Sequence, residues 1–144
     1  MAVNTPGVDV IQFPFNLLDN RFQRGNIMTL AKEKGKLLQA RSAFLQGLFF
    51  MPLADIPVKL SPLESYLKRI HNLANEYNIS IERLALMYAF CQPDIDHVII
   101  GVDNLQQLQR NLNALQQNIS AEIIEKINQV SVLETDLLYP KTWN

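Results

Sequence analysis

Three short runs of mostly apolar residues alternate along the chain with longer stretches of helical periodicity. The runs are VDVIQFPF from Val8, LLQARS from Leu37 and HVIIG from His97. Apolar residues at consecutive positions are typical of strands that are covered on both faces, as in parallel sheets. The pattern therefore predicts three strands, each covered on both faces.

The stretch between the first two runs has the periodicity of one helix. Asp19 or Asn20 can cap its beginning, and Gly35 can end it because glycine tolerates the backbone conformation that closes a helix. The apolar face of this predicted helix consists of Phe22, Ile27, Leu30 and Ala31.

Two helices are predicted between the second and third runs. Ser61 begins a capping box, in which Pro62 occupies the first helical position and Glu64 follows three residues after the cap. Ser80 caps the second of these helices. The apolar faces consist of Leu63, Leu67, Ile70, Ala74 and Tyr77 in the first helix, and of Leu84, Ala85, Tyr88 and Ala89 in the second.

Two more helices are predicted after the third run. The first follows the segment GVDN, and Ser120 caps the last. Their apolar faces are a stripe of Leu105, Leu108, Leu112 and Leu115, and a second stripe of Ile123, Ile124, Ile127 and Val130. Strands that alternate with helices, without a hairpin signal, predict an α/β fold whose parallel strands are joined by right-handed crossovers. Because composition is even, we expect residues 1–144 to form a single domain.

Composition and charge exclude several classes of function. The net charge is −1 and the 13 basic residues are scattered, so the chain has no basic stripe for nucleic acid or an anionic membrane. No segment has the length and apolarity of a membrane span, and the first ten residues contain no basic and apolar leader. The single cysteine, Cys91, cannot form an internal disulfide, which fits a reducing compartment. We expect a cytoplasmic protein with neither nucleic-acid nor membrane partners.

Ligands of parallel β/α proteins bind at the carboxyl ends of the strands, where loops diverge and helices begin. The opposite ends carry a cluster of Asp94, Asp96 and His97, which has the side chains of a metal site but no further ligands nearby. We therefore expect a solvated turn there and no metal site. The residues at or just past the carboxyl ends are Gln12, Asn16, Arg41, Ser42, Gly101 and Asp103.

Arg41 interrupts an otherwise apolar run, although a guanidinium is almost never buried without a partner. It can pair with an acid such as Asp19, extend along its stem to the surface, or face a ligand with phosphate or planar aromatic groups. Gly101 precedes a helix that Asp103 or Asn104 can cap, and this junction is either an anion site or a simple tight turn. The two histidines support no Ser-His-Asp or Cys-His arrangement, since they fall on a helix surface and at the wrong strand end.

Three segments together resemble a known family. VIQFPFNLLD, ARSAFLQGLFF and VIIGVDNLQQLQRNL resemble, in order and spacing, the last three β/α units of the aldo-keto reductases. The most specific features are IIG followed by a Gln-Leu-x-x-Asn step, from Gly101 to Asn111, and ARS followed by LQG. The resemblance covers residues 8 to about 130. It implies a partial TIM barrel of three parallel strands, from a family of oxidoreductases that use NADPH or NADH.

The resemblance also implies a role for each residue at the site. Gln12 would hold the nicotinamide carboxamide, and Arg41 would stack against the nicotinamide ring. The pyrophosphate would be lined by Ser42, Ala43, Phe44 and Gln46. The adenosine end would be surrounded by Gly101, Asp103, Gln107 and Asn111.

Two residues depart from the family pattern. Arg41 replaces the aromatic ring of many members, and its positive charge disfavours an oxidised nicotinamide. Asp103 replaces a residue that tolerates phosphate. Its carboxylate would repel the 2′-phosphate of NADPH but could accept a hydrogen bond from the 2′-hydroxyl of NADH. The sequence therefore favours NADH, provided that Asp103 is not the helix cap.

The catalytic tetrad of the family, Asp, Tyr, Lys and His, comes from the first half of the barrel, which no part of this chain matches. The chain is therefore expected to be the cofactor-binding C-terminal half of a reductase that reduces carbonyl groups by hydride transfer, without catalytic residues of its own. The alternative is a noncatalytic nucleotide-binding or partner-interaction module that resembles the potassium-channel β subunits. Three strands leave open edges, so we expect a missing N-terminal half or a second copy of the chain to complete the sheet.

Overall fold

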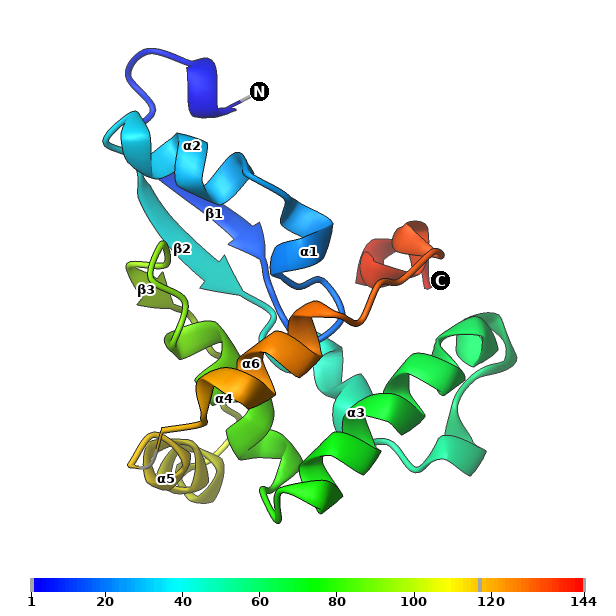
Figure 1. The fold of residues 1–144 in the computed structure, drawn as a ribbon. Helices are drawn as coiled ribbons and strands as arrows, with labels where there is room; N and C mark the ends of the chain where they lie inside the picture. The colour runs from blue at the N-terminus through cyan, green and yellow to red at the C-terminus, as the bar shows by residue number, and fades with distance from the viewer. Residues whose placement is uncertain (1, 117, 144) are drawn as a thin grey trace.

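The computed structural model describes residues 2–116 and 118–143. Three parallel strands, β1 (Val10–Pro14), β2 (Leu37–Arg41) and β3 (His97–Val98), form a sheet in the order β1-β2-β3. Helices lie between successive strands, and Figure 1 shows them gathered in front of and below the sheet. The predicted α/β class and the parallel strands are confirmed.

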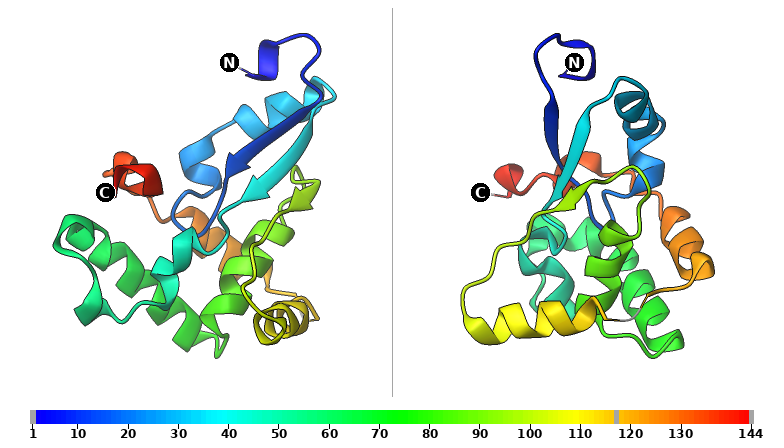
Figure 2. Two further views of the ribbon diagram at one scale, coloured as in Figure 1. Left: turned by 180° about the vertical axis from the view of Figure 1, so that it is seen from behind. Right: turned by 90° about the vertical axis from the view of Figure 1, so that its left-hand side faces the viewer.

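The two faces of the sheet have different surroundings. Residues Ile11, Leu38 and Ala40 point to one face, where α2 and α4 pack against the sheet. On the other face Val10 and Leu37 are 45% and 43% exposed. Seen from behind, in the left panel of Figure 2, β1 and β2 have no helix over them. The prediction that both faces are covered is therefore wrong within this chain, since its helices cover one face only.

The helix predicted between β1 and β2 is two helices, α1 (Arg21–Arg24) and α2 (Ile27–Glu33). The break is at Gly25, whose φ of 57° and ψ of −136° are not helical. Asn20 caps α1 as predicted, because its side chain accepts a hydrogen bond from the N–H of Gln23. Phe22 is 61% exposed, so its predicted place on the apolar face is wrong.

The two helices between β2 and β3 are α3 (Glu64–Glu76) and α4 (Ile81–Phe90). Ser80 caps α4 as predicted, with its hydroxyl accepting from the N–H of Arg83 at 3.3 Å. Ser61 does not cap α3, because it lies within a 3-10 helix, Val58–Leu63, that precedes it. Further 3-10 helices are Ala2–Asn4, Leu45–Phe50, Leu53–Asp55, Thr135–Leu138 and Pro140–Thr142.

The chain continues through α5 (Leu105–Ala114) and α6 (Ala121–Asn128). Ser120 caps α6 as predicted. The predicted apolar face of α5 is wrong for three of its four leucines. Asn111 and Ala114 are buried against the molecule, whereas three leucines face outward, with exposures of 76% for Leu105, 37% for Leu108 and 55% for Leu112. Leu115, the fourth, packs against the core as predicted.

The core lies between the sheet and the helices. Its centre is a stacked pair of rings, Phe15 after β1 and Tyr88 of α4, with centroids 5.3 Å apart and both side chains fully buried. In Figure 1, α6 crosses in front of α4. The Tyr88 hydroxyl holds it there by donating a hydrogen bond of 2.6 Å to Oδ1 of Asn128.

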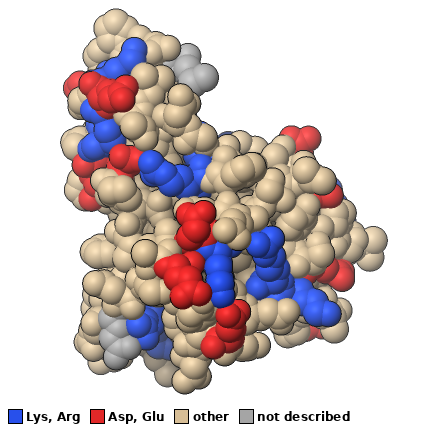
Figure 3. Space-filling model, in the orientation of Figure 1, with Lys and Arg blue, Asp and Glu red and all other residues tan. Residues whose placement is uncertain are grey.

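The surface carries charges of both signs. Figure 3 shows basic and acidic side chains interspersed on one face, in keeping with ion pairs such as Lys126 with Glu76 at 2.8 Å. Among the helices of residues 2–116 and 118–143, none combines the length and the apolar character that crossing a membrane requires.

Candidate functional site

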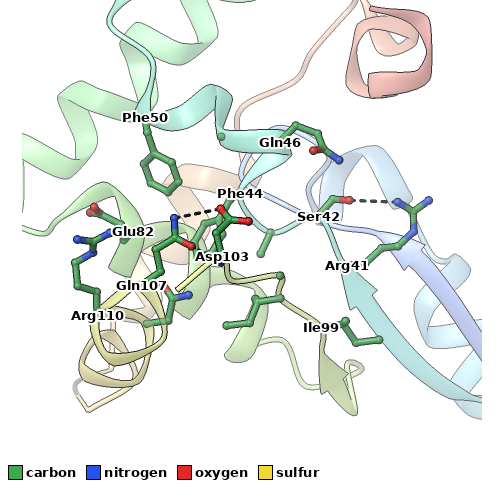
Figure 4. A pocket seen from close by; sticks show the side chains of 15 residues that line it. Arg41, Ser42, Phe44, Gln46, Phe50, Glu82, Ile99, Asp103, Gln107 and Arg110 are labelled. Carbon is green, nitrogen blue, oxygen red and sulfur yellow. Dashed lines mark hydrogen bonds between the residues drawn. The ribbon is translucent and has the colours of Figure 1, made fainter. Parts of the chain in front are cut away.

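A pocket of about 700 Å³ lies beyond the carboxyl ends of β2 and β3. Two segments that are far apart in sequence form most of it: the loop after β2, and the segment from β3 into α5 (Figure 4). Nine of the ten residues predicted to bind a cofactor line this pocket. They are Arg41, Ser42, Ala43, Phe44, Gln46, Gly101, Asp103, Gln107 and Asn111.

The tenth predicted residue, Gln12, lies outside the pocket. It is exposed on the open face of β1, opposite Gln39 of β2. Asn16, also near the end of β1, is fully buried and shapes a turn, because its Oδ1 accepts hydrogen bonds from the N–H groups of Leu18 and Asp19. The first strand therefore contributes less to the pocket than the sequence predicted.

Arg41 ends β2 with an exposed side chain that faces the pocket. Its Nη1 donates a hydrogen bond of 3.2 Å to Oγ of Ser42. The ion pair considered between Arg41 and Asp19 does not form, because Asp19 pairs with Arg24. Burial raises the pKa of Asp19, and the two arginines oppose that effect. Arg41 therefore lines the pocket without an ion-pair partner at Asp19.

The loop after β2 is tightly wound. Ser42, Leu45 and Gln46 have φ values of 60°, 46° and 54°, in the left-handed region that non-glycine residues rarely adopt. The turns are closed by backbone hydrogen bonds of 2.9 Å, from Leu45 to Ser42 and from Gly47 to Phe44. Leu45 is fully buried and anchors the loop, while Gln46 is exposed at its rim.

The segment from Gly101 to α5 forms the opposite wall. Asn104 is the cap of α5, since its Oδ1 accepts from the N–H of Gln107 at 2.9 Å. Asp103 is not the cap. Its N–H donates to Oε1 of Gln107 at 2.7 Å, and its Oδ2 accepts from Nε2 of Gln107 at 3.4 Å. The carboxylate of Asp103 therefore remains on the pocket side (Figure 4).

Further pocket residues were not predicted from the sequence. Phe50 comes from the end of the loop, Glu82 from α4 and Arg110 from α5. Figure 4 shows these three at the end of the pocket away from Arg41. Phe50 sits in an apolar run, which signals burial, and Arg110 sits in a polar helix, which signals a surface. The packing of α5 beside α4 brings Arg110 to the same end of the pocket as Glu82.

The acidic cluster at the other end of the sheet forms ion pairs. Both carboxylate oxygens of Asp96 accept hydrogen bonds from Lys32, and one also accepts from the N–H of Leu38 at 2.7 Å. Asp94 pairs with Arg21 at 2.8 Å. The segment is an exposed turn at Asp96 and His97, as expected, and these contacts tie it to α1, α2 and β2. In the described part of the chain, His, Cys, Asp and Glu side chains form no group of three or more suited to a metal ion.

The sequence of residues 3–132 matches the family model of the aldo/keto reductase family. The chain belongs to this family. The fold agrees with that of solved aldo-keto reductases. The holo form of AKR11C1 from Bacillus halodurans superposes with a TM-score of 0.71 at 20% identity, over 92% of this chain and 46% of that one. Its apo form gives 0.69 at 20% identity, over 92% and 47%.

A thermostable aldo-keto reductase, Tm1743, solved in complex with the inhibitor epalrestat, gives a TM-score of 0.61 at 16% identity, over 85% of this chain and 39% of that one. The chain thus spans less than half the length of these aldo-keto reductases. Its fold is a partial TIM barrel with three parallel strands, as the resemblance implied.

Proposed function

We propose that this chain is the cofactor-binding portion of an NAD(P)H-dependent oxidoreductase of the aldo-keto reductase family, and that the nicotinamide dinucleotide binds in the pocket beyond β2 and β3. The observation that carries the proposal is the convergence of Arg41–Gln46 and Gly101–Asn111 on one pocket. A family motif whose two halves lie far apart in sequence and together in space is well suited to a long ligand that contacts both.

The proposed roles follow the layout of the pocket. Ser42 and Gln46 lie beside Arg41 at one end, where the pyrophosphate and the nicotinamide would bind. Asp103 and Gln107 lie near the other end and would surround the adenosine. Gln12, on the open face of β1, would hold the carboxamide of a nicotinamide that extends out of the pocket over the sheet.

The cofactor supplies a hydride for carbonyl reduction. The residues of this chain bind and orient the cofactor, and the acid that protonates the carbonyl oxygen would come from outside the chain, in the half of the barrel that its sequence does not match. Because Asp103 is not the helix cap, its carboxylate is available to a ribose hydroxyl and opposes a 2′-phosphate. We therefore propose NADH as the preferred cofactor.

We also propose that the open surfaces are covered either by the half of the barrel that the sequence does not match or by a second copy of the chain. The open face of the sheet exposes Val10 and Leu37, and α5 exposes its leucines. Apolar surface of this kind is unfavourable in water and marks a contact.

Calorimetric titration of the chain with NADH and NADPH tests the cofactor proposal. We expect NADH to bind, and Arg41→Ala to weaken it about tenfold, because hydrogen bonds to charged groups contribute about 1.5–3 kcal/mol. Arg69→Ala, on the exposed surface of α3 outside the pocket, is the matched control and should leave binding unchanged. The absence of binding for both cofactors would contradict the proposal.

A further inference from the structure

A second pocket, of about 450 Å³, lies in the groove between α3 and α6 (Figure 1). Two contacts show that the helices are antiparallel along it. Nη1 of Arg69 in α3 donates a hydrogen bond of 3.4 Å to the carbonyl of Gln129, just after α6. Further along α3, Glu76 forms an ion pair of 2.8 Å with Lys126 of α6. Among the described residues, none that lines this groove also lines the pocket beyond β2 and β3.

One wall of the groove is a stripe of hydrogen-bond donors on α3. Ser65, Lys68, Arg69 and Asn72 line the groove and have exposed side chains. Residues three or four apart lie on the same face of a helix, and Lys68 and Arg69 each have this spacing from both Ser65 and Asn72. Ammonium and guanidinium groups only donate hydrogen bonds, and a hydroxyl or an amide can donate as well. The wall therefore suits a ligand that is rich in acceptors.

The charges in the groove are unbalanced. Lys126 is neutralised, because it pairs with Glu76 at 2.8 Å and with Glu122 at 3.5 Å. Among the described residues, no ion pair includes Lys68 or Arg69. The hydrogen bond of Arg69 to the carbonyl of Gln129 uses only one of the five N–H groups of a guanidinium. Two positive charges are thus left for a ligand.

A phosphate group matches this arrangement. As a monoester it carries a charge of about −1.5 to −2 at pH 7 and three strong acceptor oxygens. A guanidinium can bond to two of these oxygens at once, and an ammonium adds a compact charge beside it. A single carboxylate would match only one of the two cations. The volume of the groove is in the range of small-molecule sites and leaves room for the rest of an ester.

We propose that the groove between α3 and α6 binds a small-molecule phosphate monoester, whose phosphate group is held by Lys68 and Arg69. Ser65 and Asn72 donate to the remaining phosphate oxygens. The amide of Gln129 and the carboxylate of Glu76 line the rest of the groove and accept hydrogen bonds from hydroxyl groups of the ligand. This site is separate from the cofactor pocket and does not depend on the proposed function.

Calorimetric titration of the full chain with glucose 6-phosphate, inorganic phosphate and glucose tests the site. We expect both phosphates to bind and glucose not to bind. Arg69→Ala and Lys68→Ala should each weaken glucose 6-phosphate about tenfold, because each removes a hydrogen bond to a charged group. Arg41→Ala alters the other pocket and should leave this affinity unchanged. The absence of phosphate binding, or a loss with Arg41→Ala but not with Arg69→Ala, would overturn the proposal.

A substitution that strengthens binding separates the site from any effect on folding. Glu76→Gln removes the nearer carboxylate partner of Lys126, so that Lys126 can also reach the phosphate, and should tighten glucose 6-phosphate about threefold. Glu33→Gln, an exposed acid of α2 outside the groove, is the matched control and should change nothing. A folded Glu76→Gln variant with unchanged or weaker affinity would refute the assignment.

A conservative change and a second ligand complete the test. Arg69→Lys keeps the charge and should recover most of the affinity that Arg69→Ala loses, while circular dichroism establishes that each variant is folded. The affinity for NADH should be the same in Arg69→Ala, Glu76→Gln and the unmodified chain, because the cofactor pocket shares no described residue with the groove. Loss of NADH binding alone would contradict the proposed function, whereas loss of glucose 6-phosphate binding alone would contradict this site.

Discussion

The side-chain amide of Asn20 donates a hydrogen bond of 2.7 Å to the backbone carbonyl of Val130. This bond joins the beginning of α1 to the segment that follows α6. The same nitrogen donates to the carbonyl of Ile127 at 3.0 Å. The oxygen of this amide caps α1. Because Asn20 is fully buried, the two contacts of its nitrogen are shielded from water, whereas the cap is partly buried.

Replacement of Asn20 by alanine should destabilise the fold by about 2–4 kcal/mol, since it removes a helix cap and leaves the buried carbonyl of Val130 without its donor. The carbonyl of Ile127 loses one donor but still accepts a hydrogen bond from the N–H of Val130. Urea unfolding measures the loss. Asn104→Ala, which removes the exposed cap of α5, should cost only about 1 kcal/mol. Equal losses in the two variants would mean that the contacts with α6 contribute nothing.

Tyr88 should make the stability fall at alkaline pH. Burial raises its pKa above the ordinary value of about 10. Above that pH the folded state therefore keeps a proton that the unfolded state has lost, and stability declines as the pH rises. At pH 7, Tyr88→Phe should lower the free energy of unfolding by about 1–2 kcal/mol, because it loses the hydrogen bonds with the N–H of Arg21 and with Asn128.

The free energy of unfolding of the unmodified chain should then approach that of Tyr88→Phe between pH 10 and 11, as measured by urea unfolding at each pH. Tyr139→Phe, an exposed position, is the control and should follow the unmodified chain throughout. A stability difference between the two chains that stays constant with pH would contradict a raised pKa for Tyr88.

Asp96 should contribute stability that is lost in acid. The hydrogen bond from the N–H of Leu38, followed by that from Lys32, holds the pKa of Asp96 below its usual range. A lowered carboxylate pKa stabilises the fold above the unfolded-state value of about 3.9, and that contribution disappears as the pH falls through the lower, folded-state value. Asp96→Asn should cost about 1 kcal/mol at pH 7 and less as the pH falls below about 3.9.

Thermal unfolding across this range of pH checks the prediction, with the exposed carboxylate of Asp55 changed to asparagine as the matched control. A loss that is the same at pH 7 and near pH 2 would show that the charge of Asp96 has no part in it.

Asp103→Ser should shift cofactor preference toward NADPH. The carboxylate opposes a 2′-phosphate, and serine removes that repulsion while keeping a hydroxyl that can bond to it. We expect the ratio of NADPH to NADH affinity to rise about tenfold, measured by parallel titrations. Asp136→Ser, remote from the pocket in the tail, should leave the ratio unchanged.

Leu112→Glu should convert an associated chain to a monomer without unfolding it. Leu112 is 55% exposed on α5, so a charge there costs the isolated fold at most about 0.5 kcal/mol, whereas it opposes burial against a second copy. Sedimentation velocity at micromolar concentration measures the effect. Gln109→Glu, an exposed polar position of the same helix, is the control. A folded, unmodified chain that is already monomeric would contradict association through this face.

Local chemistry allowed much of this fold to be predicted. Asn20, Ser80 and Ser120 cap their helices because a side-chain oxygen satisfies a backbone N–H whatever the tertiary surroundings. Ser61 failed as a cap because a 3-10 turn preceded the helix, and the pattern Ser-Pro-Leu-Glu does not distinguish the two.

The errors that concern the site come from packing, which a single sequence does not contain. Periodicity identified the leucine stripe of α5 but not the side on which it faces, and here Asn111 lies inward while Leu105 lies outward. Phe50 and Arg110 were missed for the same reason. An aromatic residue in an apolar run suggests the core and an arginine in a polar helix suggests the surface, but both line the pocket. The family motifs, unlike periodicity, predicted that Arg41 and Gly101 lie at the same site although they are far apart in sequence, and both residues line the pocket.

The left-handed residues of the loop after β2 limit how the pocket can evolve. Leu45 combines a strained backbone with a side chain that fills the core, so replacing it by glycine would relax the turn but open a cavity beneath it. Gln46 has a similarly strained backbone but lies exposed at the rim of the pocket. Glycine there would relieve the strain and increase the conformational entropy of the unfolded chain, so the net effect on stability should be small. Natural variation in the shape of this rim should therefore accumulate at position 46, while position 45 keeps a large aliphatic residue.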